Sequence, residues 1–239
     1  GSLVVSATQP SLTIGTHANT AVGDILLCQL INKNVTANAF SPPDGTWTAV
    51  IATEVNDCTT AADDHQYGLY WKRATVAGAQ NFVFTKAVDD NVLFAGILSS
   101  WRGALATGSP LDATAAARTE TAGAADNVSF PAYDPTSTSV HVIFMAYYGN
   151  DQCAFAAAMS ADTNPDCTTR YDVESATGND CNLSCTSGDN DGSNVAARTW
   201  ASGSTTDAGN TGVVFALVAE PPVFGQVFRS PVFRSGVIR

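Results

Sequence analysis

Charged side chains are scarce in this sequence, because Lys, Arg, Asp and Glu make up only 14% of its 239 residues. The exposed faces of helices usually hold Lys, Glu, Gln and Arg, so the composition disfavours a helical protein. Ala, Thr, Ser, Gly and Asn are abundant instead. The composition therefore favours strands joined by long polar loops, and a hydrophobic content of 45% is enough for a sizeable core.

Long apolar runs and catalytic motifs are also missing. No run approaches the roughly 18 apolar residues that a spanning helix needs, so we expect no membrane span. The three histidines are scattered and the six cysteines form no C-x-x-C motif, which disfavours a zinc site. The motifs G-x-S-x-G, H-E-x-x-H, G-x-G-x-x-G and the P-loop are absent. We therefore predict a protein that is not an enzyme and that needs no cofactor.

Basic side chains number 11 against 22 acidic ones, so the net charge is −11. Three of the basic residues lie between residues 221 and 239, where there is no acid. Residues 1–220 thus carry eight basic and 22 acidic side chains, a net charge of −14. A body this acidic repels phosphate backbones, and we expect no nucleic-acid partner.

Short runs of alternating apolar and polar residues recur along the chain and are rich in Val, Ile, Phe, Tyr, Trp and Thr, as in half-buried strands. The clearest runs are residues 23–31, 46–52, 67–72, 81–85, 92–101, 140–148 and 211–219. Gly, Pro, Asp and Asn separate them. The predicted fold class is all-β: an antiparallel, jelly-roll-like β-sandwich over residues 1–220, followed by an extended C-terminal arm over residues 221–239.

Two further patterns concern the organisation of the sandwich. The strands around Leu26 and Phe144 are each followed by a polar, cysteine-containing loop and then by a Thr-rich strand, which hints at an internal repeat. Residues 56–66 and 162–194 are polar, and we predict that both are loops. Loops of that length are usually functional or disordered.

Several motifs in the first half are similar to those of a known module. They are Val22-Gly23-Asp24-Ile25-Leu26-Leu27, Pro42-Pro43-Asp44-Gly45-Thr46-Trp47-Thr48, Leu69-Tyr70-Trp71-Lys72-Arg73-Ala74, Phe82-Val83-Phe84-Thr85, and Ser100-Trp101-Arg102-Gly103 with Pro110-Leu111-Asp112. Over about residues 20–115 the chain resembles a β-sandwich module of tailed-phage tail fibres, head fibres and decoration proteins. The motifs are structural and carry over no site; we expect Arg102 to pair with an acid or to stack on an aromatic ring.

The resemblance implies a non-enzymatic virion structural protein, a capsid decoration or fibre protein located in the virion or outside the cell. Its expected partners are other virion subunits and further copies of itself, as a homo-oligomer. Two alternatives remain open at this point. One is a carbohydrate- or receptor-binding module that reads a host-surface glycan, and the other is a subunit of a bacterial surface filament.

The C-terminal arm repeats a Val-Phe or Val-Ile pair, mostly followed by Arg. Pro221 and Pro222 separate it from the last strand, and Pro231 prevents a helix. Such a segment suits binding to another subunit by strand addition or side-chain pockets, although it can also fold back on its own body. The predicted partner-binding residues are Phe224, Phe228, Arg229, Phe233 and Arg234.

Candidate ligand residues lie in polar stretches. Residues 188–194 offer Asp189 and Asp191 as calcium ligands, but they lack the distal Glu of an EF-hand loop, and the alternative is a solvated loop. Asp63-Asp64-His65 is interpreted as an exposed polar loop. His141 lies in an apolar strand, where a core or edge histidine is expected in preference to a catalytic base.

The cysteines divide into two groups. Cys28 lies in an apolar run and is expected to be a buried free thiol, whereas exposed loop thiols are a liability, so one or two loop disulfides are expected. Six cysteines allow fifteen connectivities. The disulfide candidates are Cys153, Cys167, Cys181 and Cys185, with Cys153–Cys167 and Cys181–Cys185 as the nearest pairs in sequence.

Overall fold

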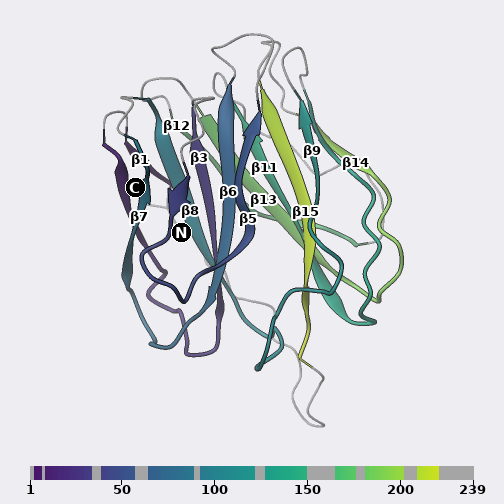
Figure 1. Cartoon of the computed structure of the whole chain (residues 1–239). Helices are drawn as coiled ribbons and strands as arrows, with labels where there is room; N and C mark the ends of the chain where they lie inside the picture. The colour runs from purple at the N-terminus through teal and green to yellow at the C-terminus, as the bar shows by residue number, and fades with distance from the viewer. Residues whose placement is uncertain are drawn as a thin grey trace, which may run out of the picture.

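Antiparallel β-strands make up all the regular structure that is described. The computed structural model describes residues 3–6, 9–33, 39–56, 64–88, 92–121, 127–149, 165–175, 181–201 and 209–220. Within these residues there is no helix, and the paired strands all run antiparallel. The predicted all-β, antiparallel, sandwich-like class is confirmed (Figure 1).

A five-stranded sheet with the order β1-β8-β3-β6-β5 forms the centre of the first half. Its strands are β1 (Val4–Ser6), β3 (Ile25–Asn32), β5 (Thr48–Asn56), β6 (His65–Arg73) and β8 (Phe94–Trp101). A smaller sheet with the order β2-β7-β4 packs on one face and consists of β2 (Ser11–Gly15), β4 (Phe40–Ser41) and β7 (Asn81–Lys86). The first and last strands of this half, β1 and β8, are neighbours in the larger sheet, and β5 pairs with β6 at its other edge.

The second half repeats this plan. Its five-stranded sheet has the order β12-β13-β11-β15-β9. The strands are β9 (Ala117–Thr121), β11 (Val140–Tyr148), β12 (Thr168–Ser175), β13 (Cys181–Asn190) and β15 (Asn210–Val218). A two-stranded sheet of β10 (Asn127–Phe130) and β14 (Arg198–Ala201) packs on one face.

The two halves are copies of one another in topology, and their central strands share one register. Read from its other edge, the second sheet is β9-β15-β11-β13-β12, which matches β1-β8-β3-β6-β5 strand for strand. Leu30 lies opposite Gly96 in the first sheet, and Ala146 lies opposite Gly212 in the second. Both residues of the second pair follow their counterparts by 116 positions (146 − 30 and 212 − 96). We call the halves repeat 1 (β1–β8) and repeat 2 (β9–β15).

The outer sheets obey the same relation, and the edge strands β5 and β12 share a bulge. Leu12 lies opposite Phe84 in repeat 1, and Val128 lies opposite Trp200 in repeat 2, again 116 positions later (128 − 12 and 200 − 84). A β-bulge follows the second residue of β5 and also the second residue of β12, here 120 positions later (169 − 49), and β5 has a second register shift between Ile51 and Glu54. The hint of a repeat around Leu26 and Phe144 therefore reflects a real duplication, since these residues lie on the equivalent strands β3 and β11.

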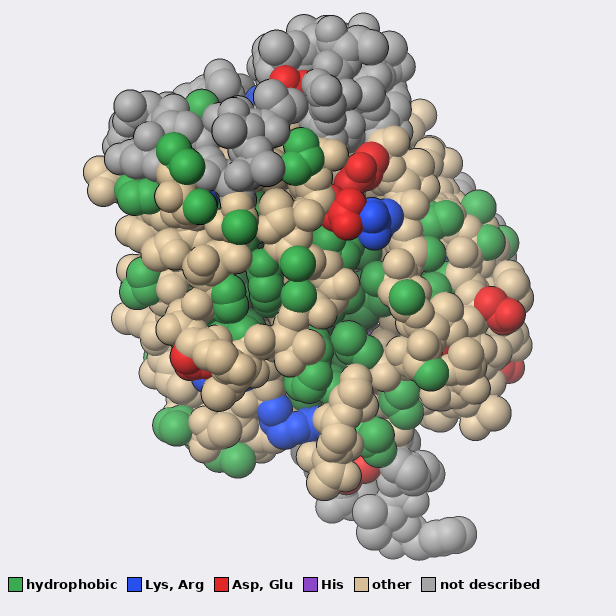
Figure 2. All heavy atoms as spheres, in the orientation of Figure 1, with side chains coloured by type: hydrophobic (Ala, Val, Ile, Leu, Met, Phe, Trp, Pro, Cys, Tyr) green, Lys and Arg blue, Asp and Glu red, His purple; other side chains and the backbone are tan. Residues whose placement is uncertain are grey.

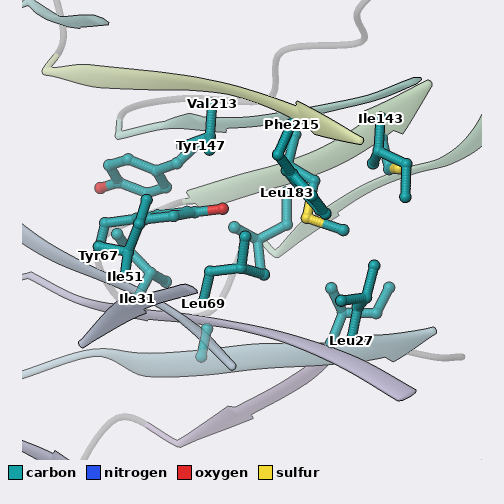
Figure 3. Packing of buried hydrophobic residues seen from close by; sticks show 14 of the residues in the cluster. Leu27, Ile31, Ile51, Tyr67, Leu69, Ile143, Tyr147, Leu183, Val213 and Phe215 are labelled. Atoms are coloured by element: carbon teal, nitrogen blue, oxygen red, sulfur yellow. The ribbon is translucent and has the colours of Figure 1, made fainter. Parts of the chain in front are cut away.

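The four sheets stack in layers, and hydrophobic clusters fill the spaces between them. The central cluster lies between the two five-stranded sheets and takes side chains from both repeats. In Figure 3, Leu27 and Tyr67 of one sheet face the side of Ile143 and Phe215 of the other. Two outer clusters each lie within one repeat, between its larger and its smaller sheet. Both faces of the central strands are therefore buried.

Equivalent faces and equivalent ends of the repeats meet at the central cluster. Lys33 Nζ donates a hydrogen bond to the carbonyl oxygen of Gly149, its own counterpart 116 positions later (149 − 33). Near the other end of the sheets, the rings of Trp101 and His141 lie 5.5 Å apart. The repeats are thus related by an approximate two-fold axis that runs along the strands, as in a homodimer whose two chains have been fused.

A buried amide fixes this arrangement. Gln29 is fully buried; its Nε2 donates to the carbonyl oxygen of Ala146 at 2.9 Å, and its Oε1 accepts from the Tyr171 hydroxyl at 2.9 Å. Both partners belong to repeat 2. Since a buried polar group without a partner costs about 1–3 kcal/mol, these bonds favour one register between the repeats.

The loop predicted over residues 162–194 is wrong, because it contains β12 and β13. β13 is a buried strand whose side chains are mostly small and polar. The carboxylate of Asp172 accepts hydrogen bonds from Asn182 at 3.0 Å and from Ser184 at 2.7 Å, so these groups can be buried at low cost. The predicted exposed loop at residues 63–65 is also wrong where it is described, since Asp64 and His65 are buried.

Candidate functional site

The two ends of the sheets differ, and this difference defines the candidate site. The strands that run toward one end finish at Asn32, Asn56, Thr121, Tyr148 and Ser175, and the register places these residues together at that end. We call it the loop end, because the segments 34–38, 57–63, 89–91, 122–126, 176–180 and 202–208 connect strands that stop or start there. We call the opposite end the arm end.

The connecting segments at the loop end have one sign of charge. Together with residues 150–164, which follow β11, they contain nine aspartates and no Lys or Arg. The aspartates are Asp57, Asp63, Asp89, Asp90, Asp126, Asp151, Asp162, Asp180 and Asp207. The sequence that connects strand ends at the loop end is therefore acidic, although its aspartates are scattered along the chain.

The described chain finishes at the arm end. β15 runs from the loop end to the arm end, after which Ala219 donates its N–H to Ser139 O and Glu220 donates its N–H to Gly103 O. Arg102 fixes this corner through Nε and Nη2, which bond to both carboxylate oxygens of the buried Asp24 at 2.9 and 3.0 Å. The expectation that Arg102 pairs with an acid is confirmed. Residues 221–239 thus begin at the end opposite the acidic segments.

The predicted partner-binding residues Phe224, Phe228, Arg229, Phe233 and Arg234 lie outside the described residues, and the prediction for them stands as a prediction. Their segment differs from the loop end in charge, with three arginines and no acid between residues 221 and 239. The molecule is therefore polarised along its strands, with acidic connections at one end and the start of a basic, apolar segment at the other.

The predicted calcium ligands are both engaged with protein groups. Asp189 lies near the end of β13, on the face toward the central cluster, and accepts a hydrogen bond from His141 Nδ1 at 2.6 Å. This hydrogen bond lowers the pKa of the Asp189 carboxyl. Asp191 accepts from the hydroxyl and the N–H of Ser193, which lower its pKa as well. Among the described residues no group of three or more His, Cys, Asp and Glu could hold a metal ion.

The cysteine prediction needs correction. Cys28 and Cys185 are buried free thiols, and Cys167 is also free, so the Cys153–Cys167 pair is not formed; Cys153 itself lies outside the described residues. Cys181 and Cys185 cannot bond to each other, because they lie on the same face of β13 four residues apart. At about 3.3 Å per residue their Cα atoms are about 13 Å apart, well beyond the 7 Å limit of a disulfide.

One chemically suggestive arrangement was missed in the sequence. His141 Nε2 lies 2.8 Å from Ser187 Oγ, and His141 Nδ1 lies 2.6 Å from Asp189 Oδ1. This is the order of contacts in a Ser-His-Asp triad. It arises because Ser187 and Asp189 share one face of β13 and His141 lies beside them on β11. No motif marks it, since the spacing depends on which strands are neighbours.

The surroundings of Ser187 do not suit nucleophilic attack. Its side chain is fully buried, and Arg170 Nε donates to its Oγ at 2.7 Å. Residue 187 is paired on both sides, with Ile143 of β11 and Thr168 of β12, so the neighbouring backbone N–H groups serve the sheet and cannot form an oxyanion hole. The three residues instead form a polar border of the central cluster at the arm end.

We accordingly expect Ser187 to be unreactive. A fluorophosphonate probe at neutral pH should label the folded chain no more than it labels the Ser187→Ala variant, as measured by mass spectrometry of the tryptic peptide. The Ser187→Ala variant should hydrolyse p-nitrophenyl acetate at the same rate as the unmodified chain. Selective, stoichiometric labelling of Ser187 would contradict the structural role.

Comparisons with family models, with curated proteins and with solved structures give no match for this chain. In the part of the chain that is described, no helix could cross a membrane.

Proposed function

We propose that this chain is a non-enzymatic virion structural protein of the capsid-decoration or fibre type. It attaches to neighbouring subunits through its C-terminal arm and presents the loop end away from the attachment point. Its partners are other virion subunits and copies of itself.

The observation that carries the proposal is the separation of the two ends. The acidic connecting segments join strands that start or finish at the loop end. Glu220, from which the C-terminal arm continues, lies at the arm end. The rigid stack of sheets between them holds the ends apart, because β3, β6, β8, β11, β13 and β15 each run its length and are buried. A protein that is anchored at one end and displayed at the other needs this polarity.

The chemistry of the ends supports the same assignment. Acidic, hydroxyl-rich connections keep a displayed surface hydrated and repel copies of themselves. A segment with repeated Val-Phe pairs and arginines is suited to apolar pockets and acidic partners. Most of the sequence motifs that resemble the phage β-sandwich module lie in repeat 1, and they favour a virion over the other settings.

The test removes the arm. The chain ending at Glu220 should keep the circular dichroism spectrum and thermal midpoint of the full chain, because the described body makes its own core. The full chain should sediment as an oligomer in analytical ultracentrifugation and the truncated chain as a monomer. In virus particles purified on a density gradient, an epitope-tagged full chain should be retained and the tagged truncated chain lost.

Two matched variants separate the contributions of the arm. Replacing Phe224, Phe228 and Phe233 with serine should abolish assembly at any salt concentration, whereas replacing the three arginines with glutamine should weaken it mainly at low salt. If the truncated chain assembles as the full chain does, the anchoring role is wrong. If the tagged chain is never found in particles but the oligomers persist, a filament subunit becomes the better assignment.

A further inference from the structure

Repeat 1 buries a lysine and an asparagine against each other, at the loop end of its outer cluster. Lys86, the last residue of β7, and Asn32, the last residue of β3, are 4% and 0% exposed. Lys86 Nζ lies 3.1 Å from Asn32 Oδ1, so the amine is next to the side-chain carbonyl. Lys86 Nζ also donates to the carbonyl oxygen of Val92 at 3.2 Å.

The asparagine is left incompletely bonded. Asn32 Nδ2 is buried and has no hydrogen-bond partner among the described residues. Such orphan donors are rare, because each costs about 1–3 kcal/mol. The Asn32 amide therefore presents its carbonyl to an amine, and no hydrogen bond within the described residues holds its nitrogen in place.

The loop end of the outer cluster also contains aromatic rings and a buried carboxyl. The His65 ring contacts Tyr147 of repeat 2, so its neighbour Asp64 is placed toward the other face of β6, the face of the outer cluster. Asp64 is buried, with 5% exposure. Phe94, whose ring lies 5.9 Å from Lys86 Nζ, stacks on Phe40 with centroids 5.7 Å apart, so the pair lies in an apolar, water-poor space.

The fold itself does not require a polar pair here. The position equivalent to Asn32 in repeat 2, 116 residues later, is Tyr148 (148 − 32), which is fully buried, and the equivalent of Phe94 is Asn210 (210 − 94). The same topology is therefore built with different side chains at this point. The Lys–Asn pair is a specific property of repeat 1.

We propose that Lys86 and Asn32 form an intramolecular isopeptide bond. The Lys86 amine, in the unprotonated form that a nucleophile requires, attacks Cγ of Asn32, a new C–N bond forms, and the bond from Cγ to Nδ2 breaks. One proton from the amine passes to Nδ2 by way of the Asp64 carboxylate, and the nitrogen leaves as ammonia. Atoms and electrons balance without an oxidant or a co-reactant, and proximity in a fixed geometry supplies much of the rate.

The bond would tie β7 of the outer sheet to β3 of the inner sheet, closing a loop between residues 54 positions apart. A cross-link of this kind restricts the unfolded chain as a disulfide does, but it does not depend on a redox environment. The outer sheet of repeat 1 could then not separate completely from the inner sheet when the chain unfolds. This inference does not depend on the virion assignment.

Mass spectrometry of the full chain tests the proposal. The denatured protein should weigh about 17 Da less than its sequence predicts, the mass of one ammonia molecule. Tandem spectra should identify the peptide that contains Asn32 joined to the peptide that contains Lys86. A full sequence mass that persists after prolonged incubation of the folded protein at 37 °C overturns the proposal, as does a loss of ammonia mapped to another asparagine.

Variants show which groups are needed. Lys86→Arg and Asn32→Ala should retain the full mass expected from their sequences, whereas Lys33→Arg, at the other buried lysine, should still lose ammonia. Asp64→Asn should form the bond more slowly, by at least tenfold in a time course after refolding. We expect Lys86→Arg to melt roughly 10 °C lower than the cross-linked chain. Bond formation in Lys86→Arg would exclude Lys86 as the nucleophile.

Discussion

Replacing Gly212 with alanine is expected to destabilise repeat 2 by about 3 kcal/mol or more, the largest effect we expect from a single methyl group in this chain. Gly212 lies in β15 directly beneath β10, and a Cβ atom built there meets the backbone oxygen of Ser129 at 2.1 Å. A backbone atom cannot rotate away as a side chain can. The outer strand β10 would have to lift off the sheet, exposing Val128 and Phe130.

The duplication supplies the matched control. Gly96 is the counterpart of Gly212 in repeat 1, and a Cβ atom built there meets the side-chain tips Ile14 Cδ1 and Leu30 Cδ2 at 2.8 Å, with the Gln29 carbonyl oxygen at 3.1 Å. Because side-chain tips can move, we expect Gly96→Ala to cost only roughly 1 kcal/mol. Urea unfolding followed by tryptophan fluorescence measures both. Equal costs at the two positions would contradict the explanation by backbone contact.

The second large effect is expected at Asp112, which lies in the connection between the repeats. Its buried carboxylate accepts hydrogen bonds from the N–H and the hydroxyl of Thr136, from Ser137 and from Tyr133, at 2.7–3.2 Å. Burial opposes ionisation, but the hydrogen bonds from Thr136, Ser137 and Tyr133 outweigh it and lower the pKa of Asp112 to about 2. Since bonds to a charged group contribute about 1.5–3 kcal/mol, Asp112→Ala should cost about 3 kcal/mol at pH 7.

The sign of the pH dependence follows from the lowered pKa. An unfolded aspartate titrates near 3.9, so the contribution of Asp112 is fully present above about pH 5 and is lost as the pH falls toward 2. The difference in unfolding free energy between the unmodified chain and Asp112→Asn should therefore shrink between pH 5 and pH 2. Asp134→Asn, at an exposed position of the same region, should show no such trend. A difference that stays constant with pH would contradict the role of the charge.

Much of the fold could be predicted from apolar periodicity. The runs at 23–31, 92–101, 140–148 and 211–219 correspond to β3, β8, β11 and β15, whose side chains are apolar on both buried faces. β13 escaped prediction because its buried side chains include Asn182 and Ser184, which are accommodated by a carboxylate on the neighbouring strand. A partner of this kind is visible only once the strands are paired.

Equivalent positions of the two repeats lie at a fixed spacing over the central and outer strands, but almost none of them hold the same residue in both repeats. Cys28 corresponds to Phe144, and Phe84 corresponds to Trp200. The residues of such pairs are both buried but differ in side-chain chemistry. The sequence alone could therefore give only a hint of an internal repeat, at the strands β3 and β11. The isolated polar contacts could not be predicted for the same reason: Lys86 and Asn32 are 54 positions apart, and only the packing of the outer sheet on the inner one brings them together.

The presence of both repeats in one chain has a consequence for how this protein can evolve. In a homodimer, each substitution appears twice, so a residue that improves one copy is imposed on the other. Here Asn32 and Tyr148 occupy equivalent places, as do His65 and Cys181, and the residues of each pair differ. The chain retains the shared interface of a symmetric pair while allowing each half its own specialisation.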